Sequence, residues 1–222
     1  MAAPSAGRIG DAPVPLSALL ERFPALEPPV PTAGAAVTIV LREGRSEVET
    51  LLIVRATNPV DPASGQVGLP GGRVDEEDDT LLATALRELD EEVGLSRSDL
   101  TDAPRYVGTQ WARAFGLHVG IFAASLGSHS RVPAPENEKE VAHVFWLPRS
   151  ALGQTRRVTR DSLRGPIEVS ATVIEGQVLW GFTRRVLRDF FGLPAEDDLG
   201  GPALPPPGSK GNVSASPTRD YK

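Results

Sequence analysis

Three glutamates between positions 88 and 92 are the residues best suited to chemistry in this chain. Glu88, Glu91 and Glu92 lie in the segment Arg87-Glu88-Leu89-Asp90-Glu91-Glu92-Val93-Gly94-Leu95. A helix turns by about 100° per residue, so these three acids share an arc of roughly 100° while Asp90 points away. Carboxylates packed this closely repel one another unless a cation relieves them. The spacing therefore favours a divalent metal, and oxygen ligands suit Mg²⁺ or Mn²⁺, with phosphates of a substrate completing the coordination.

An alternative interpretation is that these acids form only the solvated face of an ordinary amphipathic helix. A separate apolar stripe, rotated about a third of a turn from the acids, consists of Leu82, Leu86, Leu89 and Val93. Gly71 and Gly72 precede the predicted helix, and Gly94 ends it as a C-cap. The acids are thus placed beside a tight glycine turn where a ligand can approach the backbone, which favours a binding site.

The segment from Gly71 to Leu95 resembles the Nudix box, in which Gly, five residues, Glu and seven residues precede Arg-Glu-apolar-any-Glu-Glu-any-Gly-apolar. Every fixed position of the second half is present. The first half differs in two ways. Five residues separate Gly72 from Asp78, which stands where the box has Glu, and eight residues instead of seven separate Asp78 from Arg87. An Asp and an extra residue at this place are usual in the coenzyme A branch of the family, so the difference indicates a resemblance to that branch.

This resemblance implies an α/β fold, the Nudix-type α/β/α sandwich with a mixed β-sheet, and a metal-dependent pyrophosphohydrolase. It implies metal ligation by Glu88, Glu91 and Glu92, with Glu88 also a candidate to orient or deprotonate the attacking water. Arg87 is placed to form an i, i+4 ion pair with Glu91 that fixes the rotamer of a ligand. We therefore expect a supporting catalytic role for Arg87 and no contact between it and substrate.

Further site residues are expected outside the helix. In this family another acid often comes from a later loop, and here Glu140 is the first candidate and Glu138 the second, although such a charged loop is otherwise simply solvated. Arg55 ends a strand that leads towards the glycine turn, so it can give a phosphate a bidentate contact or serve a structural role. Gly71 and Gly72 are the expected substrate-binding glycines.

Two other stretches are similar to the coenzyme A branch. Leu51 to Ala56 and Gly65 to Gly72 resemble its upstream signature, but the usual further Arg of the connecting loop is absent and Leu69 replaces Phe. Val178 to Leu187 is similar to its tryptophan-glycine helix start, where packing of Trp180 is the simpler interpretation. We expect hydrolysis of a nucleoside diphosphate linked to another moiety, with coenzyme A or acyl-CoA preferred as substrate, giving 3',5'-ADP and a phosphopantetheine.

Other functions remain open within and outside the enzyme class. ADP-ribose, a dinucleotide polyphosphate or a nucleoside triphosphate are alternative substrates, because pockets for the base and tail leave no short signature. A non-catalytic nucleotide-binding Nudix domain is another alternative, but such domains usually lose the box acids that this chain keeps. The absence of cysteine excludes disulfides, thiolate zinc sites and isopentenyl diphosphate isomerases, which share the fold but depend on a cysteine.

The composition indicates one enzyme-sized domain. The chain has 222 residues, of which 40% are apolar, and its net charge of −6 argues against a nonspecific nucleic-acid binder. No apolar run approaches the roughly 20 residues of a membrane span, so we expect a soluble cytoplasmic protein, monomeric or homodimeric, with a small-molecule partner and neither nucleic acid nor membrane. Residues 16–193 form the expected Nudix domain, between disordered tails at 1–15 and 194–222.

The elements that must position these residues follow from apolar patterning. A short helix over 16–23 and a central helix that carries the acids are expected, with a closing helix over 179–191. The expected strands are 35–41, 50–55, 106–113, 117–126, 141–147, 167–169 and 172–174. His118 and His143 alternate with apolar strand residues and are expected at the surface or the edge of the core. Several strands with one central and one terminal helix predict a mixed sheet between helices.

Overall fold

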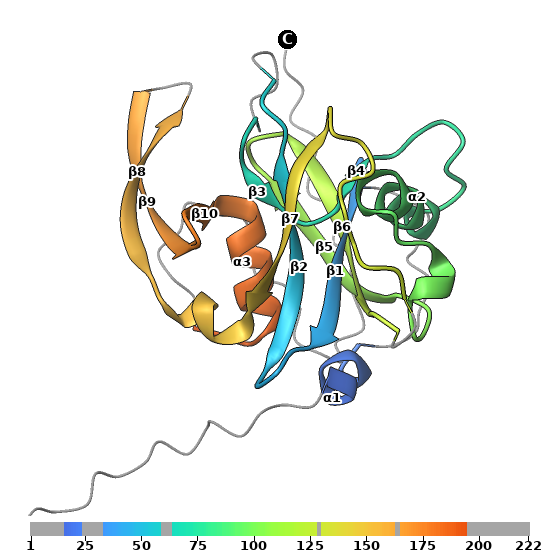
Figure 1. Ribbon diagram of the computed structural model, residues 1–222. Coiled ribbons are helices and arrows are strands. Elements are labelled where there is room, and N and C mark those ends of the chain that lie inside the picture. Colours follow the sequence, from blue (N-terminus) through green and yellow to red (C-terminus); the bar gives the residue numbers. More distant parts are fainter. Residues whose placement is uncertain (1–15, 24–32, 59–63, 128–129, 163–164, 195–222) are drawn as a thin grey trace, which may run out of the picture.

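A computed structural model, shown in Figure 1, describes residues 16–23, 33–58, 64–127, 130–162 and 165–194. The expected tails at 1–15 and 194–222 lie outside the described residues, apart from Pro194. Within the described ranges, no helix is both long and apolar enough to cross a membrane.

A seven-stranded mixed sheet forms the centre of the molecule (Figure 1). The strand order is β3-β2-β1-β6-β5, with β4 paired to β1 and β7 paired to β2. The pairing of β1 with β6 is parallel and the other pairings are antiparallel. The strands are β1 (Ala35–Glu43), β2 (Val48–Arg55), β3 (Val67–Gly68), β4 (Gly71–Arg73), β5 (Arg105–Ala112), β6 (Leu117–Ser125) and β7 (Val141–Pro148).

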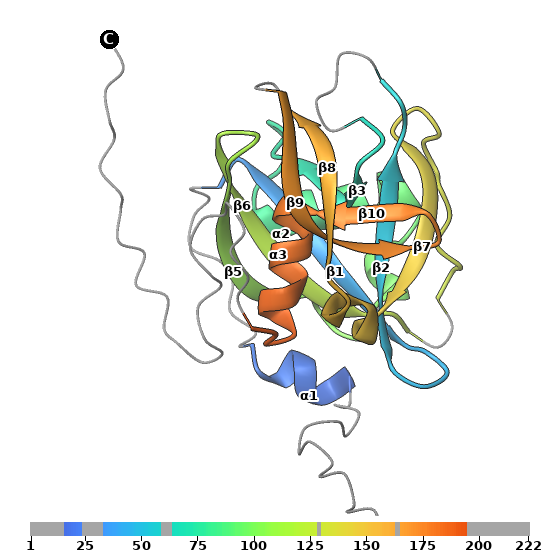
Figure 2. The same ribbon diagram turned by 90° about the vertical axis from the view of Figure 1, so that its left-hand side faces the viewer.

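A helix packs on each face of this sheet, which confirms the expected α/β/α sandwich (Figures 1 and 2). Helix α2 (Leu81–Val93) covers one face and helix α3 (Gly181–Phe190) covers the other, while the short helix α1 (Leu16–Glu21) packs against the core on the α3 side. Alternation along β1 separates the two cores, because Ile39 packs on the α3 side and Val40 on the α2 side.

Local signals define both ends of α2. The Thr80 hydroxyl accepts a hydrogen bond from the Ala83 amide, and Gly94 ends the helix with a φ of 67°, as the sequence predicted for the C-cap. The expected apolar stripe is partly wrong. Leu89 and Val93 are buried, but Leu82 and Leu86 are only half-buried, and the unpredicted Leu81 is buried instead. The buried face is turned towards the side of the helix that also carries the acids.

The C-terminal part departs most from the expected elements. The two short strands predicted at 167–169 and 172–174 are one continuous strand, β9 (Gly165–Ile174). It pairs with β8 (Arg156–Ser162) and β10 (Gln177–Trp180), which were not predicted, in a separate three-stranded sheet. Ala171 lies between the two predicted strands, and the strand continues through it because it is buried and pairs with both β8 and β10. The closing helix therefore begins at Gly181 instead of position 179.

The other expected strands and helix α1 are confirmed, with ends that differ by no more than two residues. The two-residue strand β3 and the three-residue strand β4 were not predicted, because they are too short for a periodic pattern. Two single-turn elements were also not predicted, a 3₁₀ helix η1 (Arg97–Asp99) and a 3₁₀ helix η2 (Arg149–Gly153).

Buried arginines join α3 to the three-stranded sheet. Arg184 is fully buried and donates from Nη2 to Thr155 Oγ1 at 2.8 Å and from Nε to Thr172 Oγ1 at 3.2 Å. Arg188 donates from Nη1 to the Leu152 carbonyl at 2.6 Å. These bonds compensate for the burial of two charges and fix the small sheet against the helix.

Gly71 is required where β4 approaches β1. Its φ is 147°, and a Cβ there would lie 2.2 Å from the Ala36 carbonyl oxygen, an atom of the backbone. Gly71→Ala is expected to destabilise the fold by about 3 kcal/mol or more, because both the strained φ and the overlap must be accommodated. Thermal unfolding should show a melting temperature lowered by roughly 10 °C. An unchanged melting temperature would contradict the close approach of β4 to β1.

Candidate active site

Two carboxylates are buried where α2 crosses β4. Glu92 is 1% exposed and Glu88 is 9% exposed, although both were expected on a face directed towards a ligand. The Gly71 amide donates a hydrogen bond to Glu92 Oε2 at 2.8 Å. Gly72 faces Glu88 so closely that a Cβ at this position would lie 2.3 Å from Glu88 Oε1. Both predicted glycines therefore contact the predicted metal ligands directly.

Arg87 is the centre of an ion-pair network at the start of the acidic segment. Its Nη1 lies 2.9 Å from Glu88 Oε1 and 3.0 Å from Glu91 Oε2, which confirms the predicted i, i+4 pair. Its Nη2 and Nε donate to the two oxygens of Asp78 at 2.8 and 3.2 Å, and Nη2 also donates to the Arg73 carbonyl at 3.0 Å. Asp78, whose place in the box was noted without a role, is thus the bidentate partner that orients Arg87.

Glu91 differs from the other two acids. Its side chain is 54% exposed and its carboxylate is held by Arg87. Among the residues that the structure describes, no three Asp, Glu, His or Cys side chains are already grouped as a metal-binding cluster. Shared ligation of one cation by Glu88, Glu91 and Glu92 therefore stays a prediction.

Arg55 lies near a buried carboxylate at the end of β2, and Glu140 immediately precedes the paired strand β7. Arg55 Nη1 lies 3.9 Å from Glu92 Oε1. The Ala56 amide donates to the Glu140 carbonyl at 2.8 Å, and the charge of Glu140 acts on both Glu88 and Glu92. Glu138 is exposed on the same loop and is not among the main influences on either carboxylate. Glu140 is also exposed, and a catalytic role for either glutamate stays a prediction.

Burial controls the protonation of the two inner carboxylates. It raises the pKa of Glu92 to about 8, a shift opposed by the Gly71 amide and by Arg55 and increased by the charges of Glu88 and Glu140. Burial also raises the pKa of Glu88, with opposition from Arg87. By contrast, the hydrogen bonds from Arg87 lower the pKa of Asp78 to about 2. A cation beside Glu88 and Glu92 would compete with the proton that Glu92 otherwise retains near neutral pH.

The donor set fits a hard divalent cation. Glu88, Glu91, Glu92 and Glu140 supply only carboxylate oxygens, which Mg²⁺ and Mn²⁺ prefer. Two of these groups are buried, and neighbouring negative charges raise the pKa of both, from Glu91 and Glu140 for Glu88 and from Glu88 and Glu140 for Glu92, so a positive ion would stabilise them. The glycine at position 72 leaves space beside Glu88 that a side chain would fill.

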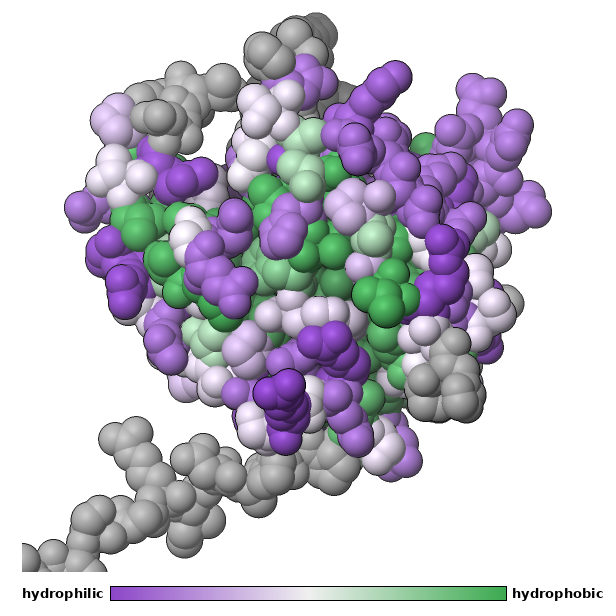
Figure 3. Space-filling model, viewed as in Figure 1, coloured by the Kyte–Doolittle hydropathy of each residue, from purple (hydrophilic) through white to green (hydrophobic). Residues whose placement is uncertain are grey.

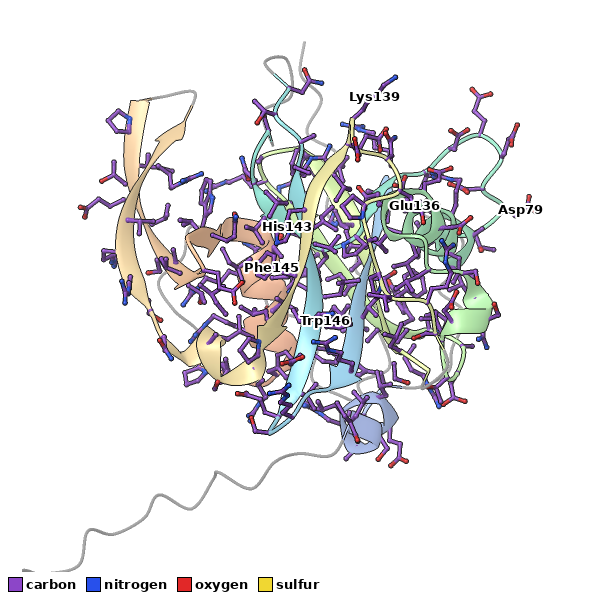
Figure 4. The ribbon with its side chains drawn as sticks, viewed as in Figure 1. Asp79, Glu136, Lys139, His143, Phe145 and Trp146 are labelled. Carbon is purple, nitrogen blue, oxygen red and sulfur yellow. The ribbon has the colours of Figure 1, made fainter. Side chains whose placement is uncertain are left out.

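A loop between β6 and β7 binds the end of α2, a feature that the sequence did not reveal. The Glu136 amide donates to the Glu92 carbonyl at 3.2 Å, and Figure 4 shows the Glu136 side chain beside α2. Asp99 holds this loop from η1, because its carboxylate accepts hydrogen bonds from the Arg131 amide and from the Ser96 amide and hydroxyl. No spacing rule links Asp99 to Arg131, which are distant in sequence.

Comparison with known proteins identifies relatives by sequence. The family model described as NUDIX domain matches residues 32–164. A protein named "Uncharacterized Nudix hydrolase NudL" from Yersinia enterocolitica is 32% identical over 144 residues, which cover 63% of this chain and 71% of the relative. A protein of the same name from Yersinia pestis is 32% identical over 142 residues, covering 63% and 69%.

Two solved structures show more distant similarity. A C. elegans Ap4A hydrolase in a binary complex is 22% identical, with a TM-score of 0.41 and coverage of 52% of this chain and 80% of that chain. The NUDIX domain of Shewanella oneidensis NrtR, complexed with ADP ribose, is 23% identical, with a TM-score of 0.40 and coverage of 54% and 75%. These similarities identify no substrate for this chain.

The glycine at position 72 offers a test of the site that leaves the backbone intact. In Gly72→Ala the new Cβ meets the flexible end of Glu88, so the carboxylate must move while the fold persists. We expect a melting temperature within a few degrees of the wild type and a divalent-cation affinity at least about tenfold weaker, because ligand geometry is lost. Calorimetric titration with Mn²⁺ measures this affinity. Unchanged affinity for Mn²⁺ would show that Gly72 is not part of the cation site.

The pKa shifts predict an unusual pH dependence of stability. Between about pH 4.5 and 8 folded Glu92 retains a proton that the unfolded chain releases, so metal-free stability should fall as pH rises through this range. Glu88 contributes in the same direction. Asp78 does not contribute in this window, since its lowered pKa affects stability only under more acidic conditions.

Urea unfolding at pH 5 and pH 8, with EDTA or with excess Mg²⁺, measures this dependence. Mg²⁺ should raise the stability more at pH 8 than at pH 5, because it binds the deprotonated carboxylates. The matched variant Glu92→Gln keeps an oxygen for the Gly71 amide and should show a smaller loss of stability between the two pH values. A metal-free protein that becomes more stable from pH 5 to pH 8 would contradict the assignment.

Proposed function

Because this chain belongs to the Nudix family, we propose that it is a metal-dependent pyrophosphohydrolase acting on a nucleoside diphosphate linked to another moiety. The observation that carries this proposal is the pair of buried carboxylates, Glu88 and Glu92, held against a glycine turn beside Arg55. Buried acids with raised pKa values, one of them 3.9 Å from the partly exposed Arg55, are typical of a catalytic site and are costly for stability alone.

Glu88, Glu91 and Glu92 are the proposed ligands of Mg²⁺ or Mn²⁺, with Glu140 as a further acid. Such a cation, when bound, neutralises phosphate oxygens and lowers the pKa of water. Arg87 holds Glu91 beside Glu88, so the exposed and the buried acid are fixed relative to each other. Asp78 keeps Arg87 in place through its bidentate contact.

Glu88 is the proposed general base. Its raised pKa makes it a better proton acceptor than an ordinary carboxylate near neutral pH, and the Arg87 bond orients it. Glu140 is the second choice for this role, ahead of Glu138. Arg55 is proposed to contact a phosphate of the substrate, and the backbone at Gly71 and Gly72 allows the substrate to approach closely.

Coenzyme A or an acyl-CoA is the proposed substrate, on the strength of the displaced box and the partial upstream signature. ADP-ribose, dinucleotide polyphosphates and nucleoside triphosphates are the alternatives within the same chemistry. A non-catalytic nucleotide-binding domain is less well supported, since Glu88, Glu91 and Glu92 are all retained beside Arg87.

Product analysis by chromatography tests this function. The purified protein is incubated with Mg²⁺ and, separately, with coenzyme A, ADP-ribose, NADH, diadenosine polyphosphates and 8-oxo-dGTP. We expect 3',5'-ADP from coenzyme A, no product with EDTA, and a rate reduced by about 10²- to 10⁴-fold in Glu88→Gln, since a positioned general base contributes about this factor. Asp90→Asn is the matched control, because Asp90 is exposed on the same helix away from the site.

The outcomes separate the parts of the proposal. Cleavage of another compound would retain the hydrolase and exclude coenzyme A as the preferred substrate. Equal activity in Glu88→Gln and Asp90→Asn would exclude Glu88 as the base. Binding of a nucleotide without turnover of any compound would support the non-catalytic alternative.

A further inference from the structure

An aromatic platform lies on β7, close to the carboxylates but on the other face of the sheet. The ring of His143 is exposed and stacks on the ring of Phe145, with centroids 6.1 Å apart and planes inclined by 8°. Phe145 is 7% exposed and belongs to the core on the α3 side. Within the described part of the chain, no hydrogen bond or ion pair is formed by the His143 imidazole. Figure 4 shows both rings along β7.

A β-bulge creates this arrangement. Val54 pairs with His143 and the next residue, Arg55, pairs with Val141, so Ala142 is the additional residue of β7. Val141 therefore packs into the core on the α2 side, whereas Phe145, four residues later, packs on the α3 side. Without the bulge these positions would share one face. The bulge thus directs His143 to the α3 face, while Arg55 points to Glu92 on the α2 face.

The carboxylate site and His143 are close along the strands, although they lie on opposite faces of the sheet. Arg55 is the last residue of β2 and lies across from the first residue of β7, so the carboxylate site is at the end of these strands. His143 is two residues further along β7, roughly 7 Å from the strand end. Strand β7 is at the edge of the described sheet, with β2 as its partner, so no further described strand lies beside His143.

We propose that the His143 ring, supported by Phe145, is the surface on which the base of the nucleotide substrate stacks. This inference rests on the proposed function and adds the position of the base. The diphosphate would lie at Arg55 and the buried glutamates, and the base would fold over the strand end onto His143. Half-buried Val54 beside His143 supplies apolar contact. A planar base suits this surface because stacking needs an open ring face.

The other aromatic ring of this part of β7, Trp146, packs on the α2 side and is already occupied. The Arg42 guanidinium lies over it, 4.0 Å from the ring centroid, and is fixed by Glu49. Figure 3 shows apolar surface in the middle of the face that carries β7, surrounded by hydrophilic residues. An apolar, aromatic surface of this kind favours a base over a second phosphate, which would require several converging cations.

Binding of two small probes tests the inference. ADP contains the base and a diphosphate, whereas inorganic diphosphate lacks the base, and both are titrated calorimetrically in the presence of Mg²⁺. In His143→Ala the affinity for ADP should fall by about 5- to 100-fold, the range expected for loss of one stacked base, with unchanged affinity for diphosphate. His143→Phe should retain the affinity for ADP. In turnover, His143→Ala should raise KM with kcat within about twofold.

His118→Ala is the matched control. His118 is also exposed on a strand and also contacts an aromatic ring, with its centroid 4.9 Å from that of Trp111, but it lies on β6. Unchanged ADP affinity in His143→Ala, or equal losses for ADP and diphosphate, would overturn the inference and leave the proposed function intact. If the wild type bound neither probe and hydrolysed none of the nucleotides, both the inference and the proposed function would fail.

Discussion

The burial of two carboxylates between α2 and β4 is the constraint on which the site depends. Removing charged groups from water is unfavourable, and among the described residues the Gly71 amide, Arg87 and the more distant Arg55 oppose that cost. The contact also requires glycine twice, because a Cβ at Gly71 would overlap the backbone of β1 and one at Gly72 would displace Glu88. Local stability is thus reduced at the place where a cation and a polyanionic substrate can restore it, as is usual for a binding site.

Antiparallel pairing of β2 with β7 places further charged residues beside the carboxylates of α2. The end of β2 and the beginning of β7 meet, so Arg55, which lies 3.9 Å from Glu92, and Glu140, whose charge acts on both buried glutamates, come to the same end of the sheet although they are distant in sequence. The β6–β7 loop is in turn bound to the last carbonyls of α2 and to Asp99. The position of Glu140 is therefore coupled to the helix that carries Glu88 and Glu92, and a rigid arrangement of this kind favours electrostatic catalysis.

The parts predicted from sequence are those determined by local rules. The C-cap of α2 at Gly94, the Arg87 to Glu91 pair and most strands of the main sheet follow from spacing along the chain. The burial of Glu88 could not be predicted in this way, because it depends on β4, a strand of three residues. The continuous strand β9 was divided wrongly because its small and polar residues are buried only by partners elsewhere in the chain. Asp99 and the bulge at Ala142 likewise act through tertiary contacts that leave no local pattern.

The two faces of the sheet depend on different parts of the chain. The carboxylates, Arg55 and the glycine turn all lie within residues 32–164, which match the family model. The α3 face is completed by residues beyond that range, where Leu179, Val186, Leu187 and Phe190 are fully buried. Since these residues support the core beneath Phe145, changes in α3 or the small sheet can alter the face beside His143 without touching an ion pair of Arg87. The proposed hydrolytic residues and the proposed base site thus lie on opposite sides of one sheet, an arrangement in which substrate preference can change while the hydrolytic residues stay the same.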